Sequence, residues 1–487
     1  MDLDVVRSPM AFLRHMLGDL LMDRGLADYE AWWEAEGRAT SEAIDRIGTP
    51  GLRMFDRVGR RIDEILYPPA YWQLLRRGYE AGAVWRPFEA RSLVPSYLLG
   101  YVTSFYDPGL YCPHTVSLAT AVPLHKYGSD FIKESFLAPF LRREGPLWQG
   151  ATWMTEAKGG SDLGAAVETT AVADGGRWRL TGEKFFGSNA GAEVAVVAAR
   201  PRGAEAGVRG LALFVLPRYR SDGSLNYHIR RLKDKIGTRS VPTGEVELAD
   251  SEAYLLEPPE WGIYLILEVL NISRVANSIA SAALAQRALA EALAFAEQRT
   301  AFGRPVLEHP LLRQQFADRK VRVQMAFALA WEAVRLLDEV WLQKPRYSGQ
   351  YHLFRLVAHL AKYWTAEVAV QMATWAMIVH GGAGVLADYP VERLLREAMI
   401  LPIWEGTPHR QILDGMEVME RREAHHLLFR HLSSDADTRA VDAMAARVDA
   451  HLALGQEEKE ARAEGLFADL ATFVASTALQ RLRRKRG

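Results

Sequence analysis

Cysteine is almost missing from this 487-residue sequence, which contains only Cys112. An intrachain disulfide is therefore excluded, and such low cysteine usage is typical of a reducing compartment, so we expect a cytoplasmic protein. In its context, LYCPHT, Cys112 is interpreted as a small packed side chain rather than a nucleophile, because free cysteine is among the most buried residue types.

An excess of charge of either sign is also missing. The sequence has 59 basic and 60 acidic residues, a formal net charge of -1, which gives nucleic acid or an anionic membrane no global attraction. The opening residues MDLDVVRSP lack the basic start and apolar core of a secretory signal. Apolar runs such as AFALAWEAVRLL are interrupted by charge before the roughly 18 consecutive residues that a spanning helix needs, so we expect no membrane partner.

No GxGxxG motif follows a strand-like segment, which argues against a Rossmann dinucleotide site. Residues 1–147 are instead rich in helix formers, aromatics and charges, with breaks at Gly48, Pro50, Pro68 and Pro69. We interpret this segment as an α-helical amino-terminal domain.

Glycine becomes frequent from residue 148 to 259, and short β-rich runs appear at 178–186, 194–199, 211–216 and 244–248. Gly-Gly and Ser-Asp-Gly sequences supply turns between them. This segment predicts an all-β middle domain, either a small barrel or a sandwich.

The helical pattern returns after residue 260, at 271–299, from 311 onward, at 351–380 and at 390–396. In the second of these helices the apolar positions fall on one face: Leu312, Phe316, Val323, Phe327, Val334 and Leu337. We expect a helical bundle domain at 260–422 and a solvated helical extension at 423–487, which ends RLRRKRG. Cations suit the carboxyl end of a helix, and a small nucleic-acid patch is the alternative interpretation. Segregated helical and strand blocks predict a multidomain α+β protein.

Four strings stand in register along the chain: MTEAKGGSD at 154–162, QRTAFGRPVLEH at 298–309, HGGAGVLADYPVERLLREA at 380–398 and IWEGTPHRQ at 403–411. Together they resemble the acyl-CoA dehydrogenase family. Further strings resemble the AidB-like branch of the alkylation response, namely GRRIDEILYPPAY at 59–71, LYCPHT at 110–115 and RLKDKIGTRS at 231–240. The resemblance covers roughly residues 60 to 420.

The resemblance implies an acyl-CoA dehydrogenase fold with an α-helical amino-terminal domain, a β middle domain and a carboxyl-terminal four-helix bundle. It implies FAD as cofactor, an acyl-CoA as substrate, a role in fatty acid metabolism and a homotetramer. In the family the flavin ring lies between the β domain and the bundle, and the adenosine end reaches a neighbouring subunit.

Glu405, in IWEGT, matches the family's catalytic base, which removes the α-proton of an acyl-CoA while hydride passes from the β-carbon to the flavin. Such a base needs a poorly solvated carboxylate, and an adjacent Trp404 and Gly406 suit a dry pocket with close backbone approach. The family polarises the thioester carbonyl with the base's own backbone N–H and a flavin hydroxyl. Outside this context, a Glu beside a Trp is typical of an exposed carboxylate.

The resemblance also assigns binding residues. Those matched to the cofactor are Met154, Thr155, Ser161, Phe186, Ser188, Arg299, Phe302, Gly381, Gly382, Trp404, Thr407 and His409. Ser161, Arg274 and Gly406 are matched to the substrate. Arg suits a pyrophosphate because its planar fork binds phosphate oxygens in pairs. No metal ligand set is predicted.

The sequence departs from the family pattern at several of these positions. Phe186 replaces the usual Trp, which places electron passage to an electron-transfer flavoprotein in question. Ile378 and Pro310 replace two glutamines near the adenosine. Ser273 stands where a helix-borne acidic base would lie in another branch, so Glu405 is the only matched base.

Three functions remain open at this point. The first is acyl-CoA dehydrogenation. The second is an AidB-like, DNA-associated or lipid-sensing flavoprotein with vestigial dehydrogenase activity. The third is a flavin oxidase of the nitroalkane type, whose relatives carry Asp at the base position, so that Glu405 argues against it.

Overall fold

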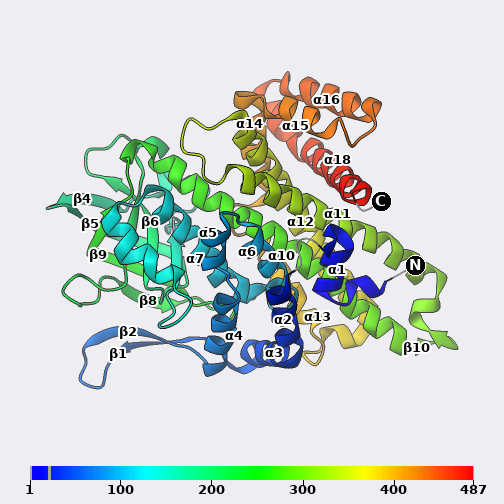
Figure 1. Ribbon diagram of the computed structural model, residues 1–487, viewed down its shortest axis with the longest axis horizontal. Coiled ribbons are helices and arrows are strands. Elements are labelled where there is room, and N and C mark those ends of the chain that lie inside the picture. The colour runs from blue at the N-terminus through cyan, green and yellow to red at the C-terminus, as the bar shows by residue number, and fades with distance from the viewer. Residues whose placement is uncertain (1–2, 20–22, 486–487) are drawn as a thin grey trace. The chain divides into compact units, whose positions relative to one another are not determined.

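The structure, a computed structural model, describes residues 3–19 and 23–485. The chain divides into two compact units, which are described separately. Figure 1 labels the helices and strands of the chain. Unit 1 comprises Met1–Ala31, Gly100–Pro108 and Arg274–Gly487, and unit 2 comprises Trp32–Leu99 and Gly109–Ser273.

Unit 2 contains a closed β barrel. Its strands are β3 (Gly150–Trp153), β4 (Thr170–Asp174), β5 (Arg177–Ser188), β6 (Val194–Pro201), β7 (Ala212–Pro217), β8 (His228–Leu232) and β9 (Thr243–Leu255). Pairing runs from β6 through β4, β5, β9 and β7 back to β6, while β3 and β8 pair with β6 and β9 from outside the ring. Large apolar side chains fill the interior, among them Trp153, Phe214 and Tyr227. The predicted strands are confirmed, and the ring makes the domain a barrel.

Unit 2 also contains helices that precede the barrel strands along the chain. They include α3 (Arg38–Ile47), α4 (Pro69–Glu80), α5 (Trp85–Ala90) and α8 (Asp130–Ile132), with α6 (Val94–Tyr106) and α7 (Pro108–Tyr127) crossing the unit boundary. The α7 helix is buried along nearly its whole length and continues through Pro113 and Pro123. The helical amino-terminal segment expected from composition is therefore present.

One element of that segment differs from the prediction. Residues 51–66 form an antiparallel hairpin, β1 (Gly51–Phe55) with β2 (Arg61–Leu66), where only helices were expected. Asp56 closes the turn by accepting from the backbone N–H groups of Val58 and Arg60, each at 2.9 Å. Buried Asp63 accepts from the N–H of Ile229 at 3.0 Å and so holds the hairpin to β8. In β2 the charged residues stand at 61, 63 and 64, which breaks the strict alternation by which a half-buried strand is recognised.

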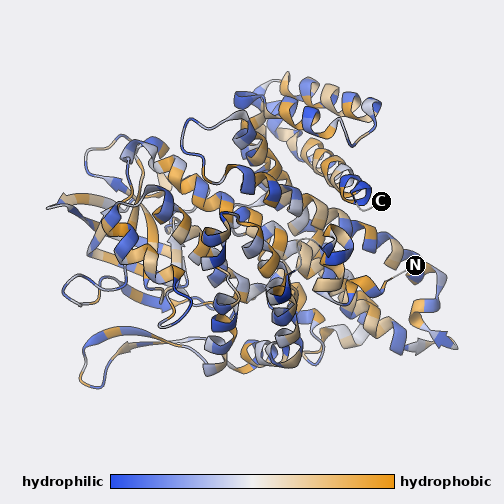
Figure 2. Ribbon diagram, in the orientation of Figure 1, coloured by the Kyte–Doolittle hydropathy of each residue, from blue (hydrophilic) through white to orange (hydrophobic). Residues whose placement is uncertain are grey.

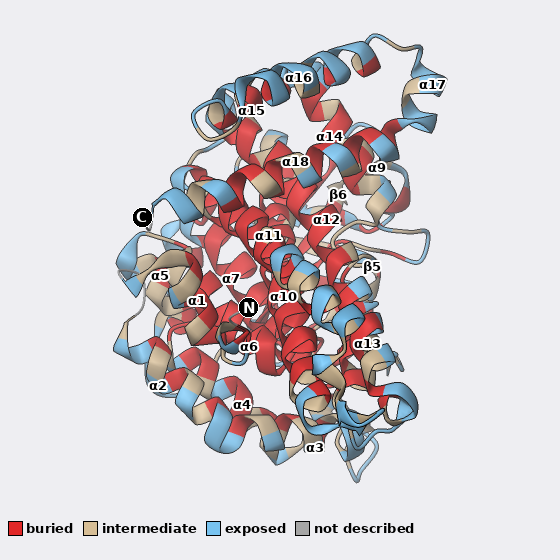
Figure 3. Ribbon diagram, turned by 90° about the vertical axis from the view of Figure 1, so that its right-hand side faces the viewer, coloured by how far each residue is buried: buried red, intermediate tan, exposed pale blue. Residues whose placement is uncertain are grey.

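Unit 1 is a helical bundle. Its long helices are the carboxyl-terminal part of α10 (Gly262–Gln298), α11 (Pro310–Val340), α12 (Gly349–His380), α14 (Pro408–Arg422) and α18 (Ala463–Arg484). Shorter helices are α1 (Pro9–Leu17), α2 (Arg24–Trp32), α13 (Val391–Ala398), α15 (Ala424–Leu432), α16 (Thr438–Leu452) and α17 (Gln456–Ala461). Several carry hydrophobic and hydrophilic residues on opposite faces (Figure 2). Figure 3 shows α11 and α12 mostly buried, and α16 and α17 mostly exposed.

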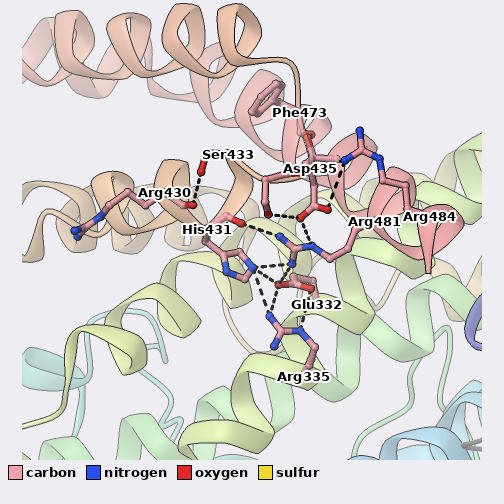
Figure 4. A network of polar contacts seen from close by, with 11 residues as sticks. Glu332, Arg335, Arg430, His431, Ser433, Asp435, Phe473, Arg481 and Arg484 are labelled. Atoms are coloured by element: carbon pink, nitrogen blue, oxygen red, sulfur yellow. Dashed lines mark hydrogen bonds and ion pairs between the residues drawn. The ribbon is translucent and has the colours of Figure 1, made fainter.

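The prediction of a solvated carboxyl-terminal extension is wrong for α18. This helix packs against α11, α12 and α14, and its apolar positions Leu466, Phe467, Leu470 and Val474 are buried at a spacing of three or four residues. Its end is held by polar contacts, because Arg481 donates to Glu332 on α11 at 2.8 Å and to Asp435 at 2.7 Å (Figure 4). The Ala- and Glu-rich composition hid this apolar stripe.

Two segments, Pro259–Gln298 and Gly349–Val385, are long and apolar enough to cross a membrane by length and composition. In their most apolar windows 78% and 44% of the residues are buried within the protein, and only the first share is that of a mostly buried core helix. The expectation that charge would interrupt every apolar run too early is wrong for these windows, which hold at most two Asp, Glu, Lys or Arg residues each.

Candidate functional site

Glu405 lies in a sharp turn between α13 and α14. Its φ is +58° and that of Gly406 is +98°, so both residues occupy the left-handed region. This conformation costs free energy for a residue with a side chain, and it persists only where the surroundings hold it. A side chain at position 406 would meet Nε2 of Gln411 at 2.6 Å, which explains the glycine.

Side chains from three helices hold the backbone carbonyls of this turn. Arg274 on α10 donates from Nε to the Glu405 carbonyl at 3.2 Å. Gln411 on α14 donates from Nε2 to the Glu405 and Gly406 carbonyls, each at 3.0 Å. Lys362 on α12 donates to the Pro402 carbonyl at 2.8 Å and to the Gly406 carbonyl at 2.6 Å. These side chains therefore fix the turn through hydrogen bonds to its main chain.

Two more contacts extend this set. Asn277 donates from Nδ2 to the Leu401 carbonyl at 3.0 Å, and the Gln411 amide oxygen lies 2.9 Å from Nδ1 of buried His359. Arg274 also lies 3.5 Å from the Asp414 carboxylate. Most polar groups beneath the turn thus have a defined partner, as buried polar groups require, and within the described residues Nε2 of His359 is an exception.

The Glu405 carboxyl is the electrostatically unusual group of the site. Burial raises its pKa to about 7, against the opposing charges of Arg274 and Lys362. Within the described residues, its carboxylate oxygens take part in no hydrogen bond, and its backbone N–H donates to no acceptor. A carboxyl with a pKa near neutrality and no fixed partner is suited to exchanging protons with a ligand.

Trp404, Thr407 and His409 flank this base. The Trp404 ring is partly buried, and within the described residues its Nε1 has no hydrogen-bond partner. Thr407 is the N-cap residue of α14, whose first turn carries the exposed His409. A buried indole N–H without a partner costs free energy, and a bound ligand that accepted a hydrogen bond from it would relieve that cost.

Arg299 and Phe302 lie after the end of α10, at the hairpin of β10 (Thr300–Ala301) and β11 (Arg304–Pro305). Phe302 is 97% exposed with a φ of +51°, and His309 lies against its edge. Arg299 is exposed, and no side-chain partner is found for it in the described part of the chain. Both side chains are free to meet a ligand or another chain.

Gly381 and Gly382 follow α12 in a short 3-10 turn, Gly381–Val385. A Cβ at either position would meet nothing within 4 Å, and Gly381 has a φ of +58°. The backbone is thus open to close approach from outside. Gly384 differs, because a Cβ there would strike the Met377 carbonyl at 2.4 Å.

The string MTEAKGGSD lies in unit 2 as a loop after β3. Met154 is buried, Thr155 is partly exposed and Ser161 is exposed. The Thr155 carbonyl accepts from the N–H of Phe185 at 3.0 Å, which ties the loop to β5. A side chain at Gly160 would meet the Thr155 hydroxyl at 2.4 Å, so that glycine leaves the hydroxyl accessible.

A buried ion pair anchors this loop. Lys184 on β5 donates to the Glu156 carboxylate at 2.5 Å, and neither side chain is more than 4% exposed. The same carboxylate accepts from the Thr169 hydroxyl at 2.6 Å and from the N–H of Glu168 at 2.7 Å. These contacts therefore hold Glu156 in place, and Glu156 is the residue next to Thr155.

Phe186 and Ser188 extend along β5 in the same unit. Phe186 is 51% exposed, and the Lys233 ammonium lies 4.6 Å from the centre of its ring. The Ser188 hydroxyl lies 3.4 Å from that of Thr243 on β9. An exposed aromatic face beside a cation is suited to an aromatic, anionic ligand.

The structure gathers Arg274, Trp404, Glu405, Gly406 and Thr407 at one turn of unit 1. It places Met154, Thr155, Phe186 and Ser188 in unit 2. Sequence reasoning missed the residues that support these groups: Lys362, Gln411, Asn277, His359, Glu156 and Lys184. Lys362 had a usable signal, since it is a lone cation in the apolar run AHLAKYW.

One cluster outside these sites offers metal-ligand atoms within the described residues. His425, His426 and Asp449 place one such atom each within 4.8 Å of one another. His425 Nε2 already lies 3.3 Å from Asp449 Oδ1, within hydrogen-bonding distance, and we assign this cluster no metal.

Comparison with known proteins matches three family models in chain order. Residues 18–140 match the Adaptive response protein AidB N-terminal domain, 151–251 the Acyl-CoA dehydrogenase middle domain and 260–419 the Acyl-CoA dehydrogenase C-terminal domain. The order of these models agrees with the observed helical, strand-rich and helical segments.

Individual proteins agree with the models. Acyl-CoA dehydrogenase family member 11 of Caenorhabditis elegans is 30% identical over 86% of this chain and 70% of its own length. The putative acyl-CoA dehydrogenase AidB of Escherichia coli is 29% identical over 79% and 72%. The crystal structure of C. elegans ACDH-11 in complex with C11-CoA has a TM-score of 0.86 at 25% identity, covering 97% of this chain and 85% of that one.

Proposed function

Because the chain belongs to the acyl-CoA dehydrogenase family and carries the AidB-type amino-terminal domain, we propose that it oxidises the α,β-bond of an acyl-CoA thioester with Glu405 as base. The observation that supports this best is the Glu405 turn. It presents a partly buried carboxyl of raised pKa and an unpaired backbone N–H from the same residue.

FAD is the cofactor of this family, and the described residues fit it. The exposed guanidinium of Arg299, the open backbone at Gly381 and Gly382, and the unpaired indole N–H of Trp404 each offer what a dinucleotide needs. In unit 2 the Thr155 hydroxyl and the exposed face of Phe186 offer a polar and an aromatic contact for the ring. When bound, FAD supplies the acceptor for the hydride that leaves the substrate's β-carbon.

The protein's own contribution is the removal of the α-proton. An α-C–H bond is a very weak acid, so the thioester oxygen has to be stabilised as negative charge develops on it. The Glu405 N–H is the chain's donor for that purpose, because no acceptor occupies it within the described residues. Burial makes the carboxylate of Glu405 more basic than one in water, and Arg274 and Lys362 keep enough of it ionised near neutral pH.

An acyl-CoA thioester is the substrate class that we propose. The support is family membership together with the structural relative, C. elegans ACDH-11, which was crystallised in complex with C11-CoA. Undecanoyl-CoA is therefore the first ligand to test, and shorter and longer chains should follow.

The test is an anaerobic titration of the purified yellow protein with acyl-CoAs from four to sixteen carbons, about the range that spans short to long chains. A substrate should bleach the flavin absorbance, and the trans-2-enoyl-CoA product should appear in equal amount. Failure to bleach with every chain length would remove this function.

A homotetramer is proposed with it. Phe302, at 97% exposure, and the exposed Arg299 are matched in the family to residues that reach the cofactor of a neighbouring subunit. Sedimentation of the flavin-loaded protein, compared with that of Arg299→Ala, tests the assembly and its link to flavin binding.

The DNA-associated alternative has less support in the structure. The tail arginines that would form a basic patch are already engaged: Arg481 with Glu332, Arg483 with Gln324 at 3.0 Å and Arg484 with the Ser434 carbonyl at 3.1 Å. Arg486, in the same run, lies outside the described residues. Duplex binding that falls steeply with added salt would favour this alternative.

A further inference from the structure

Lys362 is a buried lysine with an unusual set of partners. The residue is fully buried in α12, and its ammonium donates to the carbonyls of Pro402 and Gly406 at 2.8 and 2.6 Å. Those two carbonyls lie on either side of Glu405 along the chain. A single cation thus bridges the turn that carries the base, and this bridge needs the length of a lysine side chain.

Lys362 has no carboxylate partner within hydrogen-bonding distance among the described residues. Burying an ammonium without an ion pair is costly, and burial accordingly lowers the pKa of Lys362 to about 7. Of the opposite charges that act on it, Glu405 has the largest effect, and the pKa of Glu405 is also displaced toward 7. The cation and the base are therefore electrostatically coupled through a turn that both help to shape.

On the proposed function of Glu405, we propose that Lys362 is a positioning residue for this base: it bridges the carbonyls of Pro402 and Gly406, fixes the left-handed backbone at Glu405 and, by its charge, stabilises the carboxylate. The main-chain geometry sets where the Glu405 carboxyl and N–H point. The charge sets the pH range over which the carboxyl is ionised.

Other charged groups act on Lys362 and on the neighbouring Arg274. Those acting on Lys362 are Arg274 on α10, Glu405 and Glu367, and those acting on Arg274 include Asp414, Arg410 and Arg355, with His359 also in the cluster. Arg274 shares one task with Lys362, since its own bond is to the Glu405 carbonyl. Among the described residues, only the Lys362 side chain donates to carbonyls on both sides of Glu405.

The distinguishing experiment is an infrared titration of the Glu405 carboxyl in the flavin-loaded protein, with its band assigned by difference against Glu405→Gln. Lys362→Met keeps the side-chain volume and removes the charge and the donors. It should raise the titration midpoint by about one pH unit, because an opposite charge nearby favours the ionised carboxylate. Lys362→Arg keeps the charge and should shift the midpoint less.

Lys459→Met is the matched control. Lys459 is another largely buried lysine of unit 1, but its partner is Glu420 on α14, so the Glu405 midpoint should stay at the wild-type value. The rate of flavin bleaching by undecanoyl-CoA is measured in the wild type and in each variant. Relative to the wild type, the rate should fall at least about tenfold in Lys362→Met and should fall less in Lys362→Arg.

The outcomes separate this inference from the proposed function. If no acyl-CoA bleaches the wild-type flavin, the proposed function fails, and the titration still decides the role of Lys362. An unchanged midpoint in Lys362→Met overturns the inference. Loss of flavin and of thermal stability in both Lys362→Met and Lys362→Arg also overturns it, since the lysine would then serve the packing of the bundle.

Discussion

Arg274 donates to the backbone carbonyl of Glu405, at 3.2 Å, and not to its carboxylate. The cation therefore holds the main chain of the base while the carboxylate oxygens make no hydrogen bond within the described residues. Arg274 can therefore position Glu405 without binding the carboxylate that reacts. A carboxylate paired directly to a guanidinium would have a depressed pKa and would be a poor base, whereas the pKa of Glu405 is raised to about 7.

The first prediction concerns catalysis. Glu405→Gln should bind FAD as the wild type does, because the replacement has the same shape, but it should slow flavin bleaching by about 10³-fold, since it cannot accept the α-proton. Stopped-flow absorbance under anaerobic conditions measures this. Glu423→Gln is a suitable control, because Glu423 also has a positive φ, of 50°, in unit 1. Equal bleaching by both variants would show that Glu405 is not the base.

The second prediction concerns stability and pH. The folded-state pKa of Glu405 lies above its ordinary value of 4.5, so between about pH 4.5 and 7 the folded protein binds more protons than the unfolded chain. The contribution of Glu405 to stability therefore falls as pH rises through that window.

Glu405→Gln should accordingly match the wild type near pH 4.5 and exceed it by on the order of 1–3 kcal/mol above pH 7. Thermal midpoints of the two proteins, measured across this range, provide the check. A difference that stays constant with pH would contradict the raised pKa.

Most of the fold followed from sequence because its signals are local. The β-rich runs at 178–186 and 194–199 became β5 and β6, and helical periodicity gave α11 and α12. The hairpin at 51–66 was missed, because its stability comes from the contacts of Asp63 with β8, which are remote in sequence. The packing of α18 was missed for the same reason.

The residues of the site were likewise only partly identified from the sequence. Glu405 and Arg274 were found through family motifs, whereas Lys362 and Gln411 act through backbone carbonyls that no side-chain pattern reveals. The left-handed φ of Glu405 is likewise invisible in sequence, since only the following glycine indicates a turn. Motifs thus located the chemistry, and three-dimensional contacts were needed to identify the groups that position it.

The third prediction concerns the Glu156–Lys184 pair beneath Thr155. Lys184→Met should destabilise unit 2 by about 3–5 kcal/mol, because it leaves a buried carboxylate without its cation. Flavin affinity should fall with it, since Glu156 adjoins Thr155. The double variant Glu156→Gln with Lys184→Met removes both charges and should recover much of the loss. Denaturant unfolding and flavin titration of the single and double variants complete the cycle, and strict additivity would refute the coupling.

The fourth prediction concerns the end of α18. Glu332 on α11 accepts from Arg481 and from His431, and these contacts hold its pKa below the usual range even though burial opposes them (Figure 4). Arg481→Met should lower the stability of unit 1 by about 1–3 kcal/mol at pH 7, since Arg335 still compensates part of the Glu332 charge. Arg484→Met is the control, because its side chain is 61% exposed and an exposed pair contributes little.

The pH dependence of this pair runs opposite to that of Glu405. A carboxyl with a lowered pKa stabilises the fold above its unfolded value of about 4.5 and loses that contribution as pH falls. The difference in thermal midpoint between wild type and Arg481→Met should therefore be largest near neutral pH and shrink toward pH 3. A gap that stayed constant on acidification would mean that Arg481 stabilises α18 through apolar packing rather than through the charge of Glu332.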